Sequence, residues 1–287
     1  MGVLTKPKKE FVLNFRHKKY NFSERTHIMG VLNVTPDSFS DGGKFFSLEK
    51  AVSQALKMVE DGTDIIDIGG ESTRPGSLPV SLDEEAQRVL PVIEALAKKI
   101  QIPISIDTYK SQIAQKAFDA GAEMINDISG LRYDPEMIKI ASKYNLPVII
   151  MHIKGTPRNM QENPVYEDVV KELKNYFEER INFAVSAGIK EENIFLDPGI
   201  GFGKRFEDNL NILKNLREFG KLEKPILVGL SRKSFIGKIL DLPVEERLEG
   251  SLAALAYSIM QGAQIVRVHD VKESVRVAKV MDAILRS

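Results

Sequence analysis

The chain has 287 residues and balances 40 Lys plus Arg against 40 Asp plus Glu, so no overall charge attracts nucleic acid or an anionic membrane. The absence of cysteine excludes disulfides, thiolate metal sites and a cysteine nucleophile. No run approaches the roughly 18 apolar residues of a membrane span, and residues 1–15 lack the apolar core of a signal peptide, so we expect a cytoplasmic protein.

A small hairpin is expected near the amino terminus. Apolar residues at 11–15 and 20–22 flank a polar turn, and we expect the hairpin to close the lower mouth of the domain that follows. The predicted division is an N-terminal extension over residues 1–26 and one domain over 27–287.

Eight short apolar runs follow, and nearly every one ends in a charged or amide residue. The predicted strands cover residues 27–34, 64–70, 103–108, 124–129, 147–153, 194–200, 225–232 and 265–270. Between the predicted strands lie segments with the i, i+3, i+4 apolar spacing of helices. The strands themselves are runs of Ile and Val without alternation, which fits strands that are buried on both faces. The pattern predicts an α/β fold, a single (β/α)₈ TIM barrel whose strands all end at one face.

Two connections on that face are too long for ordinary strand-to-helix loops. They cover residues 35–47 and 72–81 and mix glycines with polar and aromatic residues. We expect both to act as lids over an active site.

Polar residues at the strand ends indicate a site for a heterocycle and an anion. Asp107, Asn126 and Asp197 together suggest acceptors for ring N–H donors, although either aspartate alone could instead cap a helix. Alternation along a strand points Arg267 and His269 the same way, and such a cation pair attracts an anion.

The segment Gly-Ile-Gly-Phe-Gly-Lys at 199–204 does not match a phosphate-binding loop. Pro198 and Arg205 stand where a Walker loop needs Gly and Ser or Thr. We expect its glycines to let the backbone approach a ligand on which Phe202 can stack.

Two further strand ends carry basic residues. Lys233 precedes a predicted helix whose N-terminus favours an anionic group, and His152 is more typical of a packed structural imidazole than of a catalytic one. The four histidines never pair at metal-ligand spacing and no nucleophile elbow is present, which argues against a zinc hydrolase or a Ser-His-Asp enzyme.

Five segments carry a specific resemblance to a known family. They are Asn-Val-Thr-Pro-Asp-Ser-Phe-Ser-Asp-Gly-Gly at 33–43, Asp-Ile-Gly-Gly-Glu-Ser-Thr-Arg-Pro-Gly at 67–76, Asp-Pro-Gly-Ile-Gly-Phe-Gly-Lys at 197–204, Ser-Arg-Lys-Ser at 231–234 and Arg-Val-His at 267–269. From about residue 27 to its end, the chain resembles the dihydropteroate synthase family.

The resemblance implies a folate-pathway transferase that joins 6-hydroxymethyl-7,8-dihydropterin diphosphate to p-aminobenzoate, with Mg²⁺ as cofactor and a homodimer as the assembly. It implies that the pterin is held by Asp107, Asn126, Asp197 and Lys233. The diphosphate would be contacted by Thr73, Arg267 and His269, and Mg²⁺ by Asn33. The p-aminobenzoate pocket would be formed by Phe39, Pro75, Phe202 and Ser234. The implied substrate-binding set also includes Arg74, and catalytic roles would fall to Asp41, Lys233, Arg267 and His269.

The residues fit a reaction without a protein nucleophile. Mg²⁺ and Arg267 would neutralise the leaving diphosphate while the pterin ring delocalises a methylene cation, so we expect an S_N1-like route. Two alternatives stay open. A pterin-dependent methyltransferase should lack the first long loop motif and the Arg267/His269 pair, and a non-catalytic pterin-binding homologue should show erosion of the lids or of Asn33.

Overall fold

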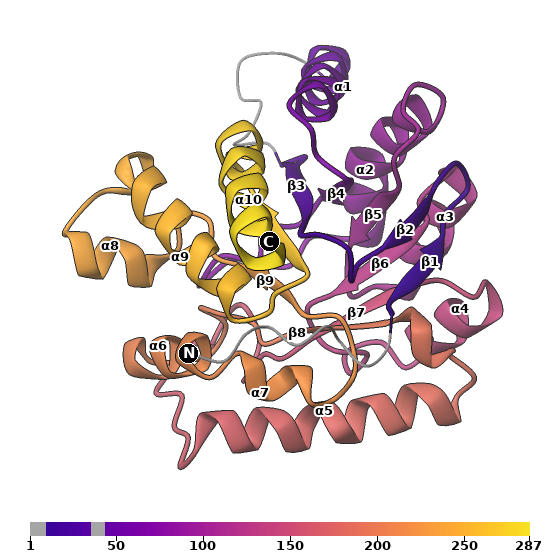
Figure 1. Cartoon of the computed structure of the whole chain (residues 1–287). Coiled ribbons are helices and arrows are strands. Elements are labelled where there is room, and N and C mark those ends of the chain that lie inside the picture. Colours follow the sequence, from indigo (N-terminus) through magenta and orange to yellow (C-terminus); the bar gives the residue numbers. More distant parts are fainter. Residues whose placement is uncertain (1–9, 36–43) are drawn as a thin grey trace.

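A parallel barrel forms the body of the protein (Figure 1), and the computed structural model describes residues 10–35 and 44–287. Its strands are β3 (His27–Asn33), β4 (Ile65–Gly69), β5 (Ile104–Asp107), β6 (Met124–Asp127), β7 (Val148–Met151), β8 (Ile194–Asp197), β9 (Leu227–Gly229) and β10 (Ile265–Val268). They pair in parallel in the order β8-β7-β6-β5-β4-β3-β10-β9, and a bridge between Leu196 and Ile226 closes the remaining gap. The predicted (β/α)₈ barrel is confirmed.

Every predicted strand is present, but several end earlier than expected. The run at 225–232 forms a strand only over β9, because a turn follows in which the Lys233 N–H donates to the Leu230 carbonyl at 3.3 Å and Arg232 has a φ of +59°. The β6 strand ends at Asp127, whose carboxylate accepts from the N–H groups of Ser129 and Leu131 at 2.7 and 2.9 Å. In both places a local turn replaces the ladder that the apolar pattern suggested.

Helices surround the strands in Figure 1 and cover the outside of the barrel. They are α1 (Lys44–Glu60), α2 (Leu82–Ala97), α3 (Ser111–Ala120), α4 (Met137–Lys143), α5 (Val169–Ser186), α6 (Phe206–Lys214), α7 (Arg217–Gly220), α8 (Ser234–Leu240), α9 (Leu248–Met260) and α10 (Val271–Arg286). Short 3₁₀ turns occupy Glu191–Asn193 and Val244–Glu246.

The ends of these helices follow ordinary capping chemistry. Ser81 caps α2 by accepting from the Glu84 N–H at 3.2 Å, and three acidic residues in the first turn favour the positive end of the helix dipole. Gly121 ends α3 with a φ of +121°, a conformation that side chains other than glycine rarely adopt.

The inside of the barrel has an apolar layer below and a polar layer above. The apolar layer is one cluster made of Met29, Ile65, Met124, Ile149, Phe195, Leu227 and Ile265. Two residues further along four of these strands, alternation brings to the inside Asp67, Asn126, Asp197 and Arg267. The polar side chains therefore gather directly above a packed floor.

The predicted hairpin is present and packs against that floor. It consists of β1 (Val12–Asn14) and β2 (Lys19–Asn21), which pair antiparallel. Leu13, Tyr20 and Phe22 belong to the same hydrophobic cluster as the barrel floor, and the Tyr20 hydroxyl donates to the Asp64 carbonyl at 2.9 Å. The hairpin thus closes the lower mouth, as expected from the sequence.

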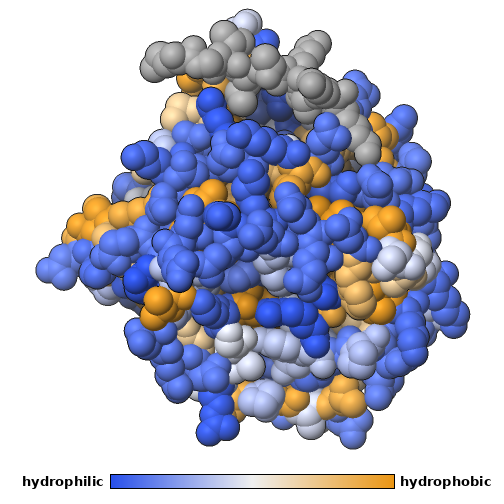
Figure 2. Space-filling model, turned by 90° about the horizontal axis from the view of Figure 1, so that it is seen from below, coloured by the Kyte–Doolittle hydropathy of each residue, from blue (hydrophilic) through white to orange (hydrophobic). Residues whose placement is uncertain are grey.

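The outer surface of the molecule exposes mainly polar side chains on the face shown in Figure 2. That face is largely hydrophilic, with hydrophobic side chains in separate small groups. Among the helices of the described residues, none is both long and apolar enough to cross a bilayer.

Truncating the hairpin's buried aromatic anchor tests its structural role. Phe22 is fully buried, with its ring centre 5.0 Å from that of Phe195, so Phe22→Ala should lower the free energy of unfolding by about 3–5 kcal/mol. Urea denaturation measures the change. The matched control is Phe183→Ala on α5, where the side chain is 41% exposed and the cost should be about 1 kcal/mol or less. Equal costs for the two variants would mean that the hairpin does not share the barrel's core.

Candidate functional site

Arg267 on β10 lies at the centre of the barrel mouth and is held between two carboxylates. Its Nε donates to Asp67 Oδ2 at 2.6 Å, and its Nη2 donates to Asp107 Oδ2 at 2.7 Å. The two aspartates come from β4 and β5, and β3 lies between β10 and β4. The long arginine side chain spans β3 to reach both, and its planar fork of donors suits two carboxylates at once.

Asp107 ends β5 beside this guanidinium. Burial raises the pKa of Asp107, Arg267 lowers it, and the like charge of Asp67 raises it again. The helix-cap alternative for Asp107 is wrong, because its carboxylate pairs with Arg267 and the N-cap of α3 is Lys110.

Asp67 and Asn126 extend this network below the mouth. Asn126 Nδ2 donates at 3.0 Å to the Asp67 Oδ2 atom that also accepts from Arg267. Both side chains are buried. Sequence reasoning about strand ends misses Asp67 because it lies two residues before the last residue of β4. A usable signal was present, since Asp67 is the charged residue within the otherwise apolar run Ile-Ile-Asp-Ile-Gly.

Asp197 and Lys233 are two groups of opposite charge that influence each other at the mouth. Burial raises the pKa of Asp197, and the charge of Lys233 opposes that shift. Burial lowers the pKa of Lys233 to about 8, so its ammonium stays largely charged at neutral pH. Asp197 does not cap a helix, because its Oδ1 accepts from the Gly199 N–H at 2.7 Å within a turn.

Phe202 lies in the glycine-rich loop beside Lys233. The Lys233 Nζ donates to the Ile200 carbonyl and sits 4.6 Å from the centre of the Phe202 ring. The loop needs its glycines, since Gly199 has a φ of +65° and a Cβ there would lie 2.1 Å from the His152 carbonyl oxygen. The glycines thus allow a close approach to another part of the chain, and the predicted approach of this loop to a ligand stays a prediction.

A buried amine fixes this loop from below. The Lys204 Nζ lies 3.1 Å from His152 Nδ1, and it donates to the carbonyls of Phe202 and His152 at 2.9 and 3.2 Å. Burial lowers the pKa of Lys204 well below its usual range, and burial followed by the Lys204 charge lowers the pKa of His152 to about 2. His152 is therefore the packed, neutral imidazole that the sequence favoured. Lys204 connects this residue, which directly follows β7, to the loop after β8.

His269 lies at the rim of the mouth, and its Nδ1 is 3.1 Å from the Ser231 hydroxyl. The groups packed around the ring and then the charges of Arg267 and Arg232 lower the pKa of His269 to about 4. The anion-binding role expected of Arg267 and His269 together stays a prediction.

The second long loop carries Thr73, Arg74 and Pro75 above the mouth. The Gly76 N–H donates to the Pro157 carbonyl at 3.0 Å, which ties the loop to the connection after β7. Arg74 and Pro75 are exposed. The charge of Arg74 contributes to the lowered pKa of His269, which places both side chains on the same rim.

Glu71 anchors the base of that loop and does not face the mouth. Its carboxylate accepts from the Tyr109 hydroxyl and from Lys110 Nζ, both at 2.7 Å, and from the Val80 N–H at 3.0 Å. Lys110 also bonds Glu85 at 2.5 Å. The polar strand end at Glu71 therefore has a structural explanation.

The remaining predicted residues divide into three groups. Phe39 and Asp41 lie outside the described residues. Asn33 is the half-buried last residue of β3, at the same face as Arg267. Ser234 is the exposed first residue of α8, directly after Lys233.

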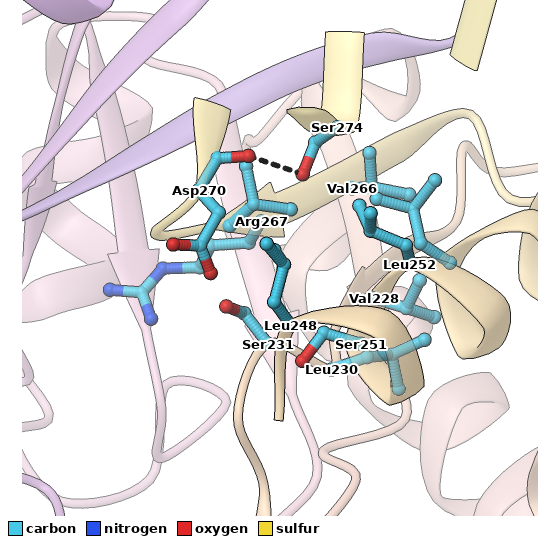
Figure 3. A pocket seen from close by; sticks show the side chains of 12 residues that line it. Val228, Leu230, Ser231, Leu248, Ser251, Leu252, Val266, Arg267, Asp270 and Ser274 are labelled. Carbon is cyan, nitrogen blue, oxygen red and sulfur yellow. Dashed lines mark hydrogen bonds between the residues drawn. The ribbon is translucent and has the colours of Figure 1, made fainter. Parts of the chain in front are cut away.

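A small cavity behind β9 and β10 is not the site itself. It measures about 10 Å³, room for about one water, and its lining combines apolar side chains of β9, β10 and α9 with polar residues that include Ser251, Asp270 and Ser274. Figure 3 shows the Arg267 guanidinium pointing away from Val228 and Leu252, toward the barrel interior. This layer supports the strand that carries Arg267 and leaves the charged head on the other side.

Residues 29–269 of the chain match the family of pterin binding enzymes. A dihydropteroate synthase of Clostridium beijerinckii is 51% identical over 270 residues, covering 94% of this chain and 98% of the relative. The structure of a Yersinia pestis dihydropteroate synthase with a sulfonamide drug complex is similar at a TM-score of 0.91 and 44% identity, covering 96% of this chain and 100% of that one. The structure of a Xanthomonas albilineans dihydropteroate synthase in complex with 7,8-dihydropteroate gives a TM-score of 0.85 at 39% identity, covering 94% and 97%.

The buried His152 predicts an acid-sensitive fold. Its pKa falls from 6.5 to about 2 on folding, so below pH 6.5 the unfolded chain takes up a proton that the folded chain does not. His152 by itself should lower the free energy of unfolding by about 1.4 kcal/mol for each pH unit below that value, in addition to the contributions of other groups such as His27, whose pKa burial also lowers. Urea denaturation from pH 7 to pH 4 measures the slope. His152→Gln should reduce the slope by about that amount, whereas His17→Gln in the exposed hairpin turn serves as the matched control. The same slope in His152→Gln would show that other groups cause the acid sensitivity.

Proposed function

Since the chain belongs to the dihydropteroate synthases within the family of pterin-binding enzymes, we propose that its barrel mouth joins 6-hydroxymethyl-7,8-dihydropterin diphosphate to p-aminobenzoate. The products are 7,8-dihydropteroate and pyrophosphate. The observation that carries the proposal is a set of acceptors at the inner ends of neighbouring strands, the partly buried Asp107 and the buried Asn126 and Asp197, in the mouth that also holds the guanidinium of Arg267. The Xanthomonas relative bound to 7,8-dihydropteroate supports the same chemistry.

The pterin ring would lie across the acceptors. A carboxylate such as Asp197 can take two parallel hydrogen bonds from an amino-pyrimidinone edge, and the ammonium of Lys233 can donate to the ring carbonyl. Burial raises the pKa of Asp197, and donors from a pterin edge would lower the cost of burying its carboxylate. They would add to the hydrogen bond that Asp197 already accepts from the Gly199 N–H.

Arg267 would hold the diphosphate end of the substrate. A guanidinium close to the leaving oxygen stabilises the negative charge that grows there as the carbon–oxygen bond breaks. Thr73, Arg74 and His269 would contribute from the rim, with the neutral His269 ring acting through hydrogen bonds. Asp41 in the first long loop would act over the mouth in catalysis.

The second substrate would bind above the pterin. Phe202 and Pro75 would pack on the ring of p-aminobenzoate, with Phe39 completing the pocket, and Ser234 would lie near its carboxylate. The attacking amine is already neutral at pH 7, so the site needs no strong general base.

The route would be S_N1-like. The electron-rich pterin delocalises the cation left at its methylene carbon, and the long loops would exclude water that otherwise captures it. A kinetic order in which p-aminobenzoate must bind before any carbon–oxygen cleavage would argue against this route.

Asn33 fits a role as the protein ligand of Mg²⁺. The ion commonly takes only one or two ligands from a protein and completes its shell with water and substrate phosphates. An amide oxygen at the end of β3, at the same face as Arg267, suits that pattern, and no cluster of three His, Asp or Glu exists among the described residues to suggest another site. When bound, Mg²⁺ would supply further charge neutralisation for the diphosphate.

Product formation from the two substrates, with and without Mg²⁺, tests the function. We expect Mg²⁺-dependent 7,8-dihydropteroate with equimolar pyrophosphate. Asp197→Ala and Lys233→Ala should each abolish the activity while the thermal midpoint stays near that of the original chain, because both side chains serve the mouth rather than the core. Tight pterin binding without product would instead favour a methyltransferase or a non-catalytic pterin-binding protein.

The assembly would be a homodimer built on the α8–α10 side. Large apolar side chains are exposed on these elements. They are Ile239, Leu240 and Val244 in and after α8, and Val280 and Ile284 on α10. Analytical ultracentrifugation should give twice the mass of one chain, and Val280→Glu combined with Ile284→Glu should shift it toward one chain. A single-chain mass for the unaltered protein at micromolar concentration would exclude the dimer.

A further inference from the structure

Asp67 occupies an unusual place for a carboxylate. It points into the barrel from β4 and has no exposed surface. A single oxygen of its side chain, Oδ2, accepts from Arg267 Nε at 2.6 Å and from Asn126 Nδ2 at 3.0 Å. Asp67 therefore joins the residue proposed for the diphosphate to a residue proposed for the pterin ring.

The contact with Asp67 decides which atom Asn126 offers to a ligand. A side-chain amide carries a donor and an acceptor at nearly the same place, and only its partners fix which way it faces. Because Nδ2 is committed to Asp67, the acceptor Oδ1 is the atom left for the ligand. Without Asp67 the amide could turn and present a donor instead.

Asp67 also holds Arg267 in place when the other partner of Arg267, Asp107, binds a ligand. Asp107 holds Nη2 in this structure but is also a proposed acceptor for the pterin. Once a pterin engages Asp107, the hydrogen bond from Nε to Asp67 still fixes the direction of the guanidinium. Asp67 itself lies too deep to bind the pterin, since it is fully buried beneath the mouth.

An unsatisfied pair of atoms marks the same spot. Asp67 Oδ1 and Ser105 Oγ are buried without hydrogen-bond partners, and Asp67 and Ser105 are paired across β4 and β5. Burying polar atoms without partners costs stability, and such exceptions in a folded protein call for an explanation. The Oδ1 atom of Asp67 thus adds a cost to the fold, while its Oδ2 atom carries both contacts.

We propose that Asp67 is a positioning residue that sets the orientation of both Arg267 and Asn126 for the pterin diphosphate substrate. The proposal rests on the function assigned above and names a residue that acts through two others without touching the substrate. Its effect should fall on the pterin diphosphate, since its hydrogen-bond partners among the described residues are Arg267 and Asn126, neither of which is proposed for p-aminobenzoate.

The test compares Asp67→Asn and Asp67→Ala with Ser105→Ala. An asparagine can keep an oxygen at the position of Oδ2 and place its amide nitrogen at the unpartnered Oδ1, so it preserves shape while removing the charge. We expect the KM for pterin diphosphate to rise about tenfold in Asp67→Asn and further in Asp67→Ala. A tenfold change is the size expected when a hydrogen bond to a charged group is lost. The KM for p-aminobenzoate at saturating pterin diphosphate should not change. Ser105→Ala removes the neighbouring buried polar group and should leave both KM values unaltered.

These readouts separate positioning from a purely structural role. If Asp67 only stabilised the fold, Asp67→Asn would lower the thermal midpoint and the fraction of active enzyme but leave the KM for pterin diphosphate within twofold, and that outcome would overturn the proposal. Should Asp67→Ala fail to fold, the Asp67→Asn result alone decides.

Calorimetry with inorganic pyrophosphate tests, without turnover, the part of the proposal that concerns the orientation of Arg267. We expect binding about tenfold weaker in Asp67→Asn than in the unaltered chain. Unchanged pyrophosphate affinity would overturn the positioning of Arg267 even if the enzyme is active. An unaltered chain that binds pyrophosphate but makes no dihydropteroate would instead overturn the proposed function, and the pyrophosphate affinity of Asp67→Asn would then decide the positioning of Arg267 by itself.

Discussion

A guanidinium held between two carboxylates inside the barrel is the interaction on which the rest of the mouth depends. Arg267 cannot be left unpaired in so enclosed a place, because an isolated buried charge is far more costly than a paired one. Asp67 and Asp107 meet that need from two other strands. The positive charge of Arg267 is thereby balanced by two carboxylates from neighbouring strands.

The polar network stands on a packed apolar floor, and the two are parts of one strand pattern. Met124 and Asn126 face inward from β6, as Ile265 and Arg267 do from β10, with the apolar residue first in each case. The hairpin packs on the floor from below, at the end opposite the face where the strands end. On β4, β6, β8 and β10 the packed floor and the polar layer are therefore separated by a single step of two residues.

Residues near the mouth divide into those that face a ligand and those that hold the loops. Glu71 and His152 both end strands, yet Glu71 anchors the base of the second long loop and His152 packs against Lys204. A strand-end position alone does not separate the two classes. The distinction comes from neighbours such as Lys110 and Lys204, which belong to other segments of the chain.

The sequence by itself determined the barrel, the hairpin and the candidates Asp107, Asn126, Asp197 and Arg267, because strand periodicity is a local property and parallel strands must end at one face. It could not determine partners. The neutral state of His269 and the burial of Asp67 under Arg267 depend on charges and packing contributed by distant strands. Only the closed barrel brings β4, β6 and β10 together, and with them the electrostatic environment in which one aspartate can orient two other side chains.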